Sequence, residues 1–91
     1  MLRVVAYDIS DSRRLRLVAK VCEDYGVRVE KSVFECNLSD ALFSIFWEEI
    51  LGIVDKNEDS LIVYPICNSC VSNILCIGKV VRFEKKECYI F

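Results

Sequence analysis

The chain has 91 residues, 54% of them apolar, and a formal net charge of -2 at neutral pH. A chain of this length holds one hydrophobic core, and its slightly acidic balance excludes a protein whose whole surface binds nucleic acid. It contains no histidine, which excludes histidine-based acid–base catalysis, serine or cysteine triads that use histidine, and histidine-ligated zinc.

The apolar surplus predicts burial against a second copy of the chain. No apolar run approaches the roughly 18 residues that span a bilayer, because charged residues interrupt each one. The first residues carry no basic segment followed by a long apolar stretch, so we expect no export signal. We therefore expect a cytoplasmic protein with reduced cysteines and no membrane partner, which forms an obligate homodimer, since two-fold homodimers are the commonest oligomers.

The first elements are predicted to be a strand and a helix. The valine-rich apolar run Leu2–Asp8 is typical of a strand that is buried on both faces. Apolar residues then recur at helical spacing over Ser12–Tyr25, and Gly26 is available to end this helix. Three polar residues are available to cap its start, namely Ser10, Asp11 and Ser12.

Residues 27–37 are rich in β-branched and aromatic side chains and are predicted to form a tight hairpin. Apolar residues occupy alternate positions, and the set of positions that they occupy changes between Val29 and Phe34. This change of apolar parity is expected if a bend near residues 30–32 splits the segment into two strands. One long strand is the alternative, because periodicity alone does not exclude it.

A second helix is predicted for Asp40–Leu51, with Ser39 as its cap. Its apolar stripe, which we interpret as core, consists of Phe43, Phe46, Trp47, Ile50 and Val54. Leu42 and Ile45 broaden the stripe beyond what packing on one sheet needs.

Residues 61–64 predict a further strand, which we expect Pro65 to end because proline cannot donate to a strand ladder. The resulting order of elements predicts an α+β, ferredoxin-like βαββαβ domain over residues 1–78. Residues 79–91 alternate apolar and charged side chains and end in three apolar ones. We expect them to form an extra C-terminal strand that pairs with a sheet edge of the partner subunit.

Asp8 is the candidate catalytic and metal-binding residue. Without histidine, the option that remains for a hydrolase is a metal ion bound by carboxylates. Mg²⁺ prefers one or two carboxylates, with several waters kept as further ligands. Asp8 stands where the first strand meets a loop, and a two-fold axis that joined both copies of Asp8 could hold one Mg²⁺ against a phosphodiester. The alternative is that Asp8 caps the first helix or satisfies loop amides.

Basic residues near the first helix and in the hairpin are candidates for contacts with the phosphates of DNA or RNA. These candidate nucleic-acid-binding residues are Arg13, Arg14, Arg16, Arg28 and Lys31. The alternative is an ordinary solvated helix face.

Cys67 and Cys70 form a single CxxC motif, with Cys76 nearby. Such a motif could ligate zinc or form a redox disulfide. A structural zinc site needs four ligands and a second CxxC is missing, so we assign no metal here and interpret these residues as loop thiols or an optional disulfide. The other cysteines, which we expect to be small buried hydrophobic residues, are Cys22, Cys36 and Cys88.

Three blocks of the sequence, in this order, resemble the CRISPR-associated Cas2 family. They are residues 5–11 (VAYDISD, followed by Arg13 and Arg14), residues 26–36 (GVRVEKSVFEC) and residues 59–65 (DSLIVYP). The middle block is the most specific. In that family Glu30 is often glutamine, and the CxxC motif and the segment after residue 78 vary.

The resemblance implies a ferredoxin-like homodimer in which Asp8 of each subunit flanks a Mg²⁺ at the interface. It also implies nucleic-acid contacts from positions such as Arg14, Arg16 and Arg28. The implied function is that of a CRISPR spacer-acquisition subunit resembling a magnesium-dependent endonuclease, which cleaves phosphodiester bonds of RNA or DNA and acts with the spacer integrase. A non-catalytic, dimeric DNA-binding adaptor that bridges integrase dimers is the alternative. A ligand-binding regulatory domain fits less well, because the sequence has no glycine-rich ligand loop.

Overall fold

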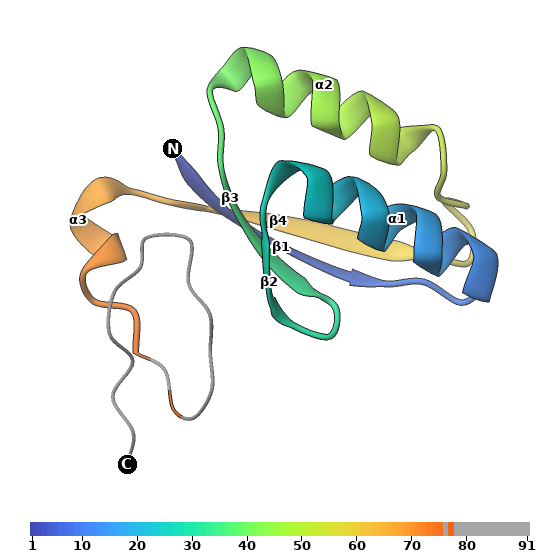
Figure 1. Ribbon diagram of the computed structural model, residues 1–91, viewed down its shortest axis with the longest axis horizontal. Coiled ribbons are helices and arrows are strands. Elements are labelled where there is room, and N and C mark those ends of the chain that lie inside the picture. Colours follow the sequence, from blue (N-terminus) through green and yellow to red (C-terminus); the bar gives the residue numbers. More distant parts are fainter. Residues whose placement is uncertain (76, 78–91) are drawn as a thin grey trace.

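The computed structural model describes residues 1–75 and 77, and two helices cover one face of a four-stranded antiparallel sheet in it (Figure 1). The elements are β1 (Leu2–Asp8), α1 (Ser12–Tyr25), β2 (Val27–Glu30), β3 (Val33–Asn37), α2 (Asp40–Leu51), β4 (Ser60–Ile66) and the short helix α3 (Asn68–Val71). This order confirms the predicted α+β, βαββαβ fold. The predicted boundary after residue 78 and the predicted strand over 79–91 lie outside the described residues. Within the described part, no helix is long and apolar enough to cross a membrane.

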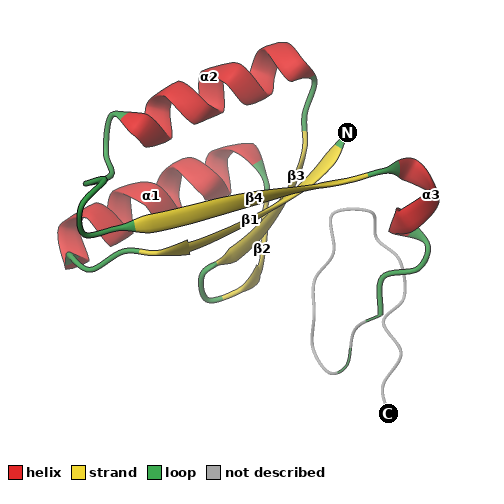
Figure 2. Cartoon of the chain, turned by 180° about the vertical axis from the view of Figure 1, so that it is seen from behind, coloured by secondary structure: helices red, strands yellow, loops and turns green. Residues whose placement is uncertain are grey.

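The strands lie in the order β2-β3-β1-β4, so β1 is paired on both sides. Val5 stands opposite Phe34 of β3 and opposite Val63 of β4. Val5 and Phe34 belong to the core beneath the helices. Since side chains alternate along a strand, Ala6 and Asp8 project from the opposite, helix-free face. Figure 2 shows from behind that both long helices lie on the same side of the sheet.

Both long helices begin at a side-chain cap. Asp11 is the cap of α1, and its Oδ2 accepts from the backbone N–H of Arg14 at 2.9 Å. Ser39 caps α2 in the same way, because its Oγ accepts from the N–H of Leu42 at 3.2 Å. Each cap satisfies an amide that has no partner within the helix. The structure therefore confirms Ser39 and selects Asp11 from the three candidates for α1.

Gly26 follows α1, and a glycine is needed at this position for a reason other than helix capping. Its backbone is extended, with φ at -157°, a conformation open to any residue. A Cβ atom added there would clash with the carbonyl oxygen of Glu35 and lie 3.0 Å from the Cβ of Cys36. The glycine is therefore needed because the chain passes close to β3 on its way into β2.

Residues 27–37 form a hairpin, as predicted, and not one long strand. The pairing register of β2 and β3 shifts between Arg28 and Glu30, which accounts for the change in apolar parity. The carbonyl of Ser32, in the turn, accepts from the N–H of Tyr7 at 3.0 Å and extends the contact between the hairpin and β1.

The prediction that Pro65 ends the strand formed by residues 61–64 is wrong, because β4 continues to Ile66. Pro65 stands opposite Arg3 of β1 within the ladder. Since β4 is an edge strand of the described sheet, a proline whose missing N–H points outward removes no bond from the ladder.

The core lies between the sheet and the two long helices. Its fully buried helical residues are Val18 and Cys22 of α1 and Phe46 and Ile50 of α2. Cys22 and Cys36 are buried, as predicted, and Cys88 lies outside the described residues. Leu42 and Ile45, which broaden the apolar stripe of α2, do not belong to the core, since they are 47% and 52% exposed.

Candidate metal and nucleic-acid site

Asp8 is the last residue of the central strand and lies exposed on the helix-free face. It stands opposite Ser60 of β4 and borders a hollow that Ala6, Ser60 and Ile62 also line. Among the described residues, its carboxylate has no hydrogen-bond or ion-pair partner. The alternative role for Asp8 is therefore excluded within this part of the chain, because Asp11 caps α1 and Asp59, not Asp8, accepts from the loop amide of Ser10.

The helix-free face around Asp8 is apolar. Ile62 and Tyr64 project from β4 on this face and are 48% and 52% exposed. Large apolar side chains exposed next to one another on a sheet are typical of a surface that another protein covers. Asp8 lies at the edge of this surface, where β1 ends.

The described residues of one subunit supply half of a site that would suit Mg²⁺. In residues 1–75 and 77, no group of three or more histidine, cysteine, aspartate or glutamate side chains is placed to hold a metal ion. Asp8 by itself supplies one exposed carboxylate without a partner among the described residues, a hard oxygen ligand of the kind that Mg²⁺ prefers. A second carboxylate, from outside one subunit's described residues, would bring the set into the usual range for Mg²⁺.

Asp59, which the sequence analysis did not single out as a site residue, organises the loops beside Asp8. Its carboxylate accepts from the backbone N–H groups of Ser10 at 3.0 Å and Asp55 at 2.8 Å, and from Nε of Arg14 at 2.8 Å. The Asp59 side chain is only 1% exposed. The hydrogen bond from Arg14, followed by the Asp55 amide, holds the pKa of Asp59 well below its usual value. Its position at the start of the third resemblance block was the available sequence signal.

Arg14 differs from its neighbours on α1 because its guanidinium has internal partners. Besides Asp59, it contacts Oε2 of Glu58 at 3.3 Å. These carboxylates, Asp59 foremost, raise the pKa of Arg14 above its already high usual value. Arg14 therefore ties the start of α1 to the loop before β4.

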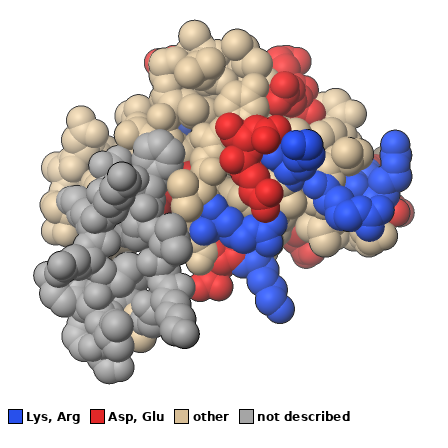
Figure 3. Space-filling view, in the orientation of Figure 1, with Lys and Arg blue, Asp and Glu red and all other residues tan. Residues whose placement is uncertain are grey.

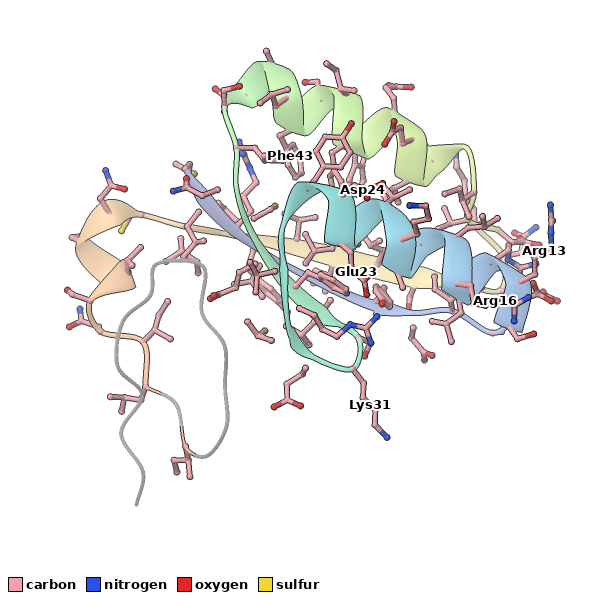
Figure 4. All side chains as sticks on the ribbon, in the orientation of Figure 1. Arg13, Arg16, Glu23, Asp24, Lys31 and Phe43 are labelled. Atoms are coloured by element: carbon pink, nitrogen blue, oxygen red, sulfur yellow. The ribbon has the colours of Figure 1, made fainter. Side chains whose placement is uncertain are left out.

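Arg13, Arg16 and Lys31 are exposed, and within the described residues their side chains form no hydrogen bond or ion pair. Figure 4 shows Arg13 and Arg16 at the start of α1, close in the chain to Asp8, whereas Lys31 projects from the β2–β3 turn. Figure 3 shows basic side chains near the start of α1 and near that turn, each with acidic side chains close by. The structure thus divides the predicted basic residues between two places on the surface.

Arg28 has partners of its own on the helix side of the hairpin. Its Nη2 donates to Oε1 of Glu23 at 2.8 Å, and its guanidinium carbon lies 5.2 Å from the centre of the Phe34 ring. Its side chain is 44% exposed, so this ion pair is open to solvent. Exposed pairs of this kind are weak, and a phosphate can compete for the arginine.

Together these features define a class of protein: a small βαββαβ domain with an exposed aspartate at the end of its central strand and exposed arginines at the start of the following helix, none of which has a side-chain partner within the described residues. The family model described as CRISPR associated protein Cas2 matches residues 1–74 of the chain. The chain belongs to this family.

Relatives with this family name match most of the chain. It is 42% identical over 71 residues to a CRISPR-associated endoribonuclease Cas2 of Moorella thermoacetica, which covers 72% of this chain and 74% of the relative. It is 33% identical to the CRISPR-associated endonuclease Cas2 of Halalkalibacterium halodurans, over the full length of both chains.

Solved structures share the fold. The crystal structure of Streptococcus pyogenes Cas2 at pH 6.5 matches with a TM-score of 0.77 and 35% identity, over 86% of this chain and 100% of that one. A second structure, a crystal structure of Cas2, matches with a TM-score of 0.68 and 27% identity, over 100% of this chain and 98% of that one.

Proposed function

We propose that the chain is a Mg²⁺-dependent endonuclease that cleaves phosphodiester bonds of RNA or DNA during CRISPR spacer acquisition, together with the spacer integrase. The observation that carries the proposal is the exposed Asp8 carboxylate, which lacks a partner among the described residues, at the end of the central strand. The names of the relatives, endoribonuclease and endonuclease, support this reaction class.

The proposed enzyme is a homodimer that stacks the helix-free faces of two sheets. This contact would cover Ile62 and Tyr64, two of the large apolar side chains that one subunit leaves exposed. A two-fold axis near the end of β1 would place Asp8 of one subunit beside Asp8 of its partner, which completes a two-carboxylate set. Residues 79–91 are proposed to add a strand to the partner's sheet.

Each group has a distinct role in this proposal. A Mg²⁺ held by the paired Asp8 carboxylates would supply an activated water and stabilise charge on the phosphate. Arg13 and Arg16 would hold the nucleic-acid backbone, with Lys31 and Arg28 as a second contact region. Arg14 would act indirectly, because its bonds to Asp59 fix the start of α1, which carries Arg13 and Arg16.

A second candidate function is that of a non-catalytic, dimeric DNA-binding adaptor that bridges integrase dimers. The guanidinium groups of Arg13 and Arg16, which form no hydrogen bond or ion pair within the described residues, favour it. This adaptor needs the dimer and the basic surface but no metal at Asp8, and its binding is independent of base sequence.

A side-by-side cleavage assay of the wild type, Asp8→Asn and Asp24→Asn tests the proposal on single-stranded RNA and duplex DNA, with and without Mg²⁺. Asp24 is the matched control, because it is an exposed aspartate on α1 whose ion pair within the described residues, to Lys20, is a long one of 3.8 Å. We expect Mg²⁺-dependent cleavage by the wild type and the control and none by Asp8→Asn, with binding of the substrate retained. If Asp8→Asn cuts as fast as the wild type, or no variant cuts, the adaptor function replaces the enzymatic one.

A further inference from the structure

Cys67 and Cys70 lie together where the chain leaves β4. Both are exposed and free, and their Sγ atoms are 3.2 Å apart. The N–H of Cys70 donates to the carbonyl of Cys67 at 2.9 Å, which closes a tight turn around the pair. Since disulfide sulfurs are bonded at about 2.05 Å, the two sulfurs need to approach by only about 1 Å, a movement that side-chain rotation can supply.

The two thiols are not equivalent, because Ser69 is the main cause that lowers the pKa of Cys67 and only the smallest contribution at Cys70. Its Oγ is 3.1 Å from Sγ of Cys67. Hydrogen bonds from the Ser69 hydroxyl and then from Cys70 lower the pKa of Cys67 to about 7, whereas the pKa of Cys70 is raised. Because the thiolate is the reactive form, Cys67 is the nucleophile of the pair and Cys70 is the resolving thiol.

The buried cysteines provide an internal contrast. Burial raises the pKa of Cys22 to about 12 and also raises that of Cys36. Neither sulfur is open to a reagent in the folded protein, since each residue is 2% exposed. Among the described cysteines, the chemistry of the reactive thiolate is thus confined to the pair after β4.

We propose that Cys67 and Cys70 form a reversible thiol–disulfide site whose co-substrate is a small-molecule disulfide of the glutathione class. The Cys67 thiolate attacks one sulfur of the disulfide, forms a mixed disulfide and releases the first small thiolate. The Cys70 thiol then gives its proton to solvent, attacks Sγ of Cys67 and releases the second thiolate. Overall, two protein thiols are oxidised to one disulfide and one small disulfide is reduced to two thiols.

This site lies apart from the proposed catalytic residue and goes beyond the proposed function. Ser60, at the start of β4, stands opposite Asp8, and Ile66, at its end, stands opposite Leu2. Six residue steps along a strand separate these ends by roughly 20 Å. Figure 1 likewise places α3 at the end of the sheet away from the start of α1. A failure of the thiol site therefore leaves the Asp8 proposal untouched, and the reverse also holds.

The test uses the full chain with Cys76→Ser and Cys88→Ser, which removes the cysteines outside the described residues. The reduced protein is incubated with oxidised glutathione at neutral pH, quenched by alkylation, and mapped by peptide mass spectrometry. We expect a Cys67–Cys70 disulfide that reduced glutathione reverses, with Cys22 and Cys36 still alkylated only after unfolding. No link between Cys67 and Cys70, or glutathione bound equally to the buried cysteines, would overturn the proposal.

Further variants test the assigned roles. In the same background, Cys70→Ser is expected to stop the reaction at a glutathione adduct on Cys67, whereas Cys67→Ser gives no such adduct. Ser69→Ala is expected to move the half-maximal pH of Cys67 alkylation upward from near 7. Ser72→Ala, at the residue that follows α3, is expected to leave it unchanged. An adduct on Cys70 in Cys67→Ser of equal yield, or stoichiometric Zn²⁺ that stays on the reduced chain during dialysis against a chelator, contradicts the proposal.

Discussion

Nε of Arg14 donates to Oδ2 of Asp59 at 2.8 Å, and this ion pair joins the start of α1 to the residue before β4. The two residues are 45 positions apart in the chain. Asp59 also accepts from the N–H groups of Ser10 and Asp55, so one buried carboxylate fixes both loops at the end of the sheet where Asp8 lies.

Asp59→Ala is expected to lower the melting temperature by several degrees. The change leaves the amides of Ser10 and Asp55 and Nε of Arg14 without the acceptor that they share, and the loss of several hydrogen bonds to one charged group is costly. Glu58→Ala is the matched control, because Glu58 also contacts Arg14, but its side chain is 63% exposed and such pairs contribute little. Thermal unfolding followed by circular dichroism measures both. Equal melting temperatures for the two variants would contradict the role of Asp59.

The same ion pair predicts an acid-sensitive fold. The folded-state pKa of Asp59 lies below the unfolded value of about 3.9, so its contribution to stability is complete above that pH and is lost as the pH falls through the folded-state pKa. Urea unfolding of the wild type should therefore show a free energy of unfolding that declines below about pH 4. In Asp59→Ala the decline should be shallower, and in Glu58→Ala it should match the wild type. An identical decline in all three proteins would assign the acid sensitivity to other carboxylates.

Two glycine substitutions should have opposite effects. Gly26→Ala places a Cβ against the carbonyl oxygen of Glu35, and relief of that clash should cost about 1–3 kcal/mol of unfolding free energy. At Gly52 the backbone is helical and the nearest atoms to an added Cβ lie at 3.5 and 3.7 Å, so Gly52→Ala should stabilise the fold by about 0.4–1 kcal/mol. Chemical denaturation measures both. A Gly26→Ala variant as stable as the wild type would show that β3 yields at that point.

Arg13 and Arg16 should contribute to nucleic-acid binding through charge. Each phosphate contact that is lost should reduce the slope of log K against log salt concentration by about one, equally for different sequences. Arg13→Ala and Arg16→Ala are compared with Lys20→Ala, which removes a charge from the same helix but at a lysine paired with Asp24. Fluorescence anisotropy over a range of salt concentrations gives the slopes. If Lys20→Ala changes the slope as much as the arginine variants do, the helix contributes only a diffuse charge.

The helix-free face should be the dimer contact. Ile62→Asp places a charge within the exposed apolar pair on β4 and is expected to raise the dimer dissociation constant by about 30-fold or more, as for an interface residue worth about 2 kcal/mol. Ile45→Asp is the control, since Ile45 is 52% exposed on α2 but lies on the other side of the sheet. Sedimentation velocity over a concentration series reports both. A dimer that survives Ile62→Asp and is lost with Ile45→Asp would place the interface on α2.

Local sequence signals were sufficient for the four strands and the two long helices, because strands, helices and caps are set largely by residues near one another in the chain. The apolar run Leu2–Asp8, the cap at Ser39 and the parity change before Phe34 all correspond to observed features, whereas the short helix α3 was not predicted. The prediction for Pro65 was wrong because it, too, relied on local signals alone. Whether a proline interrupts a strand depends on whether that strand is at an edge, which is a property of the assembled sheet.

The site was less accessible from the sequence, since its geometry depends on long-range contacts. Arg13, Arg14 and Arg16 read as one basic cluster, yet only Arg14 meets a carboxylate from a loop that lies far along the chain. The position of Asp8 at the strand end was predictable, whereas its lack of a partner in the described structure was not, because the folded chain is needed to show that Asp11 caps α1 and that Asp59 accepts from the amide of Ser10.

The central place of β1 has a consequence for synthesis of the chain. β1 is synthesised before both of its partners, β3 on one side and β4 on the other, and β4 begins only at Ser60. One edge of β1 therefore stays unpaired until the residues of β4 have been made, and chain closure over such separations is slow. During that interval the valine-rich segment of the nascent chain is open to pairing with other chains, so folding on the ribosome has to wait for β4 before this edge is protected.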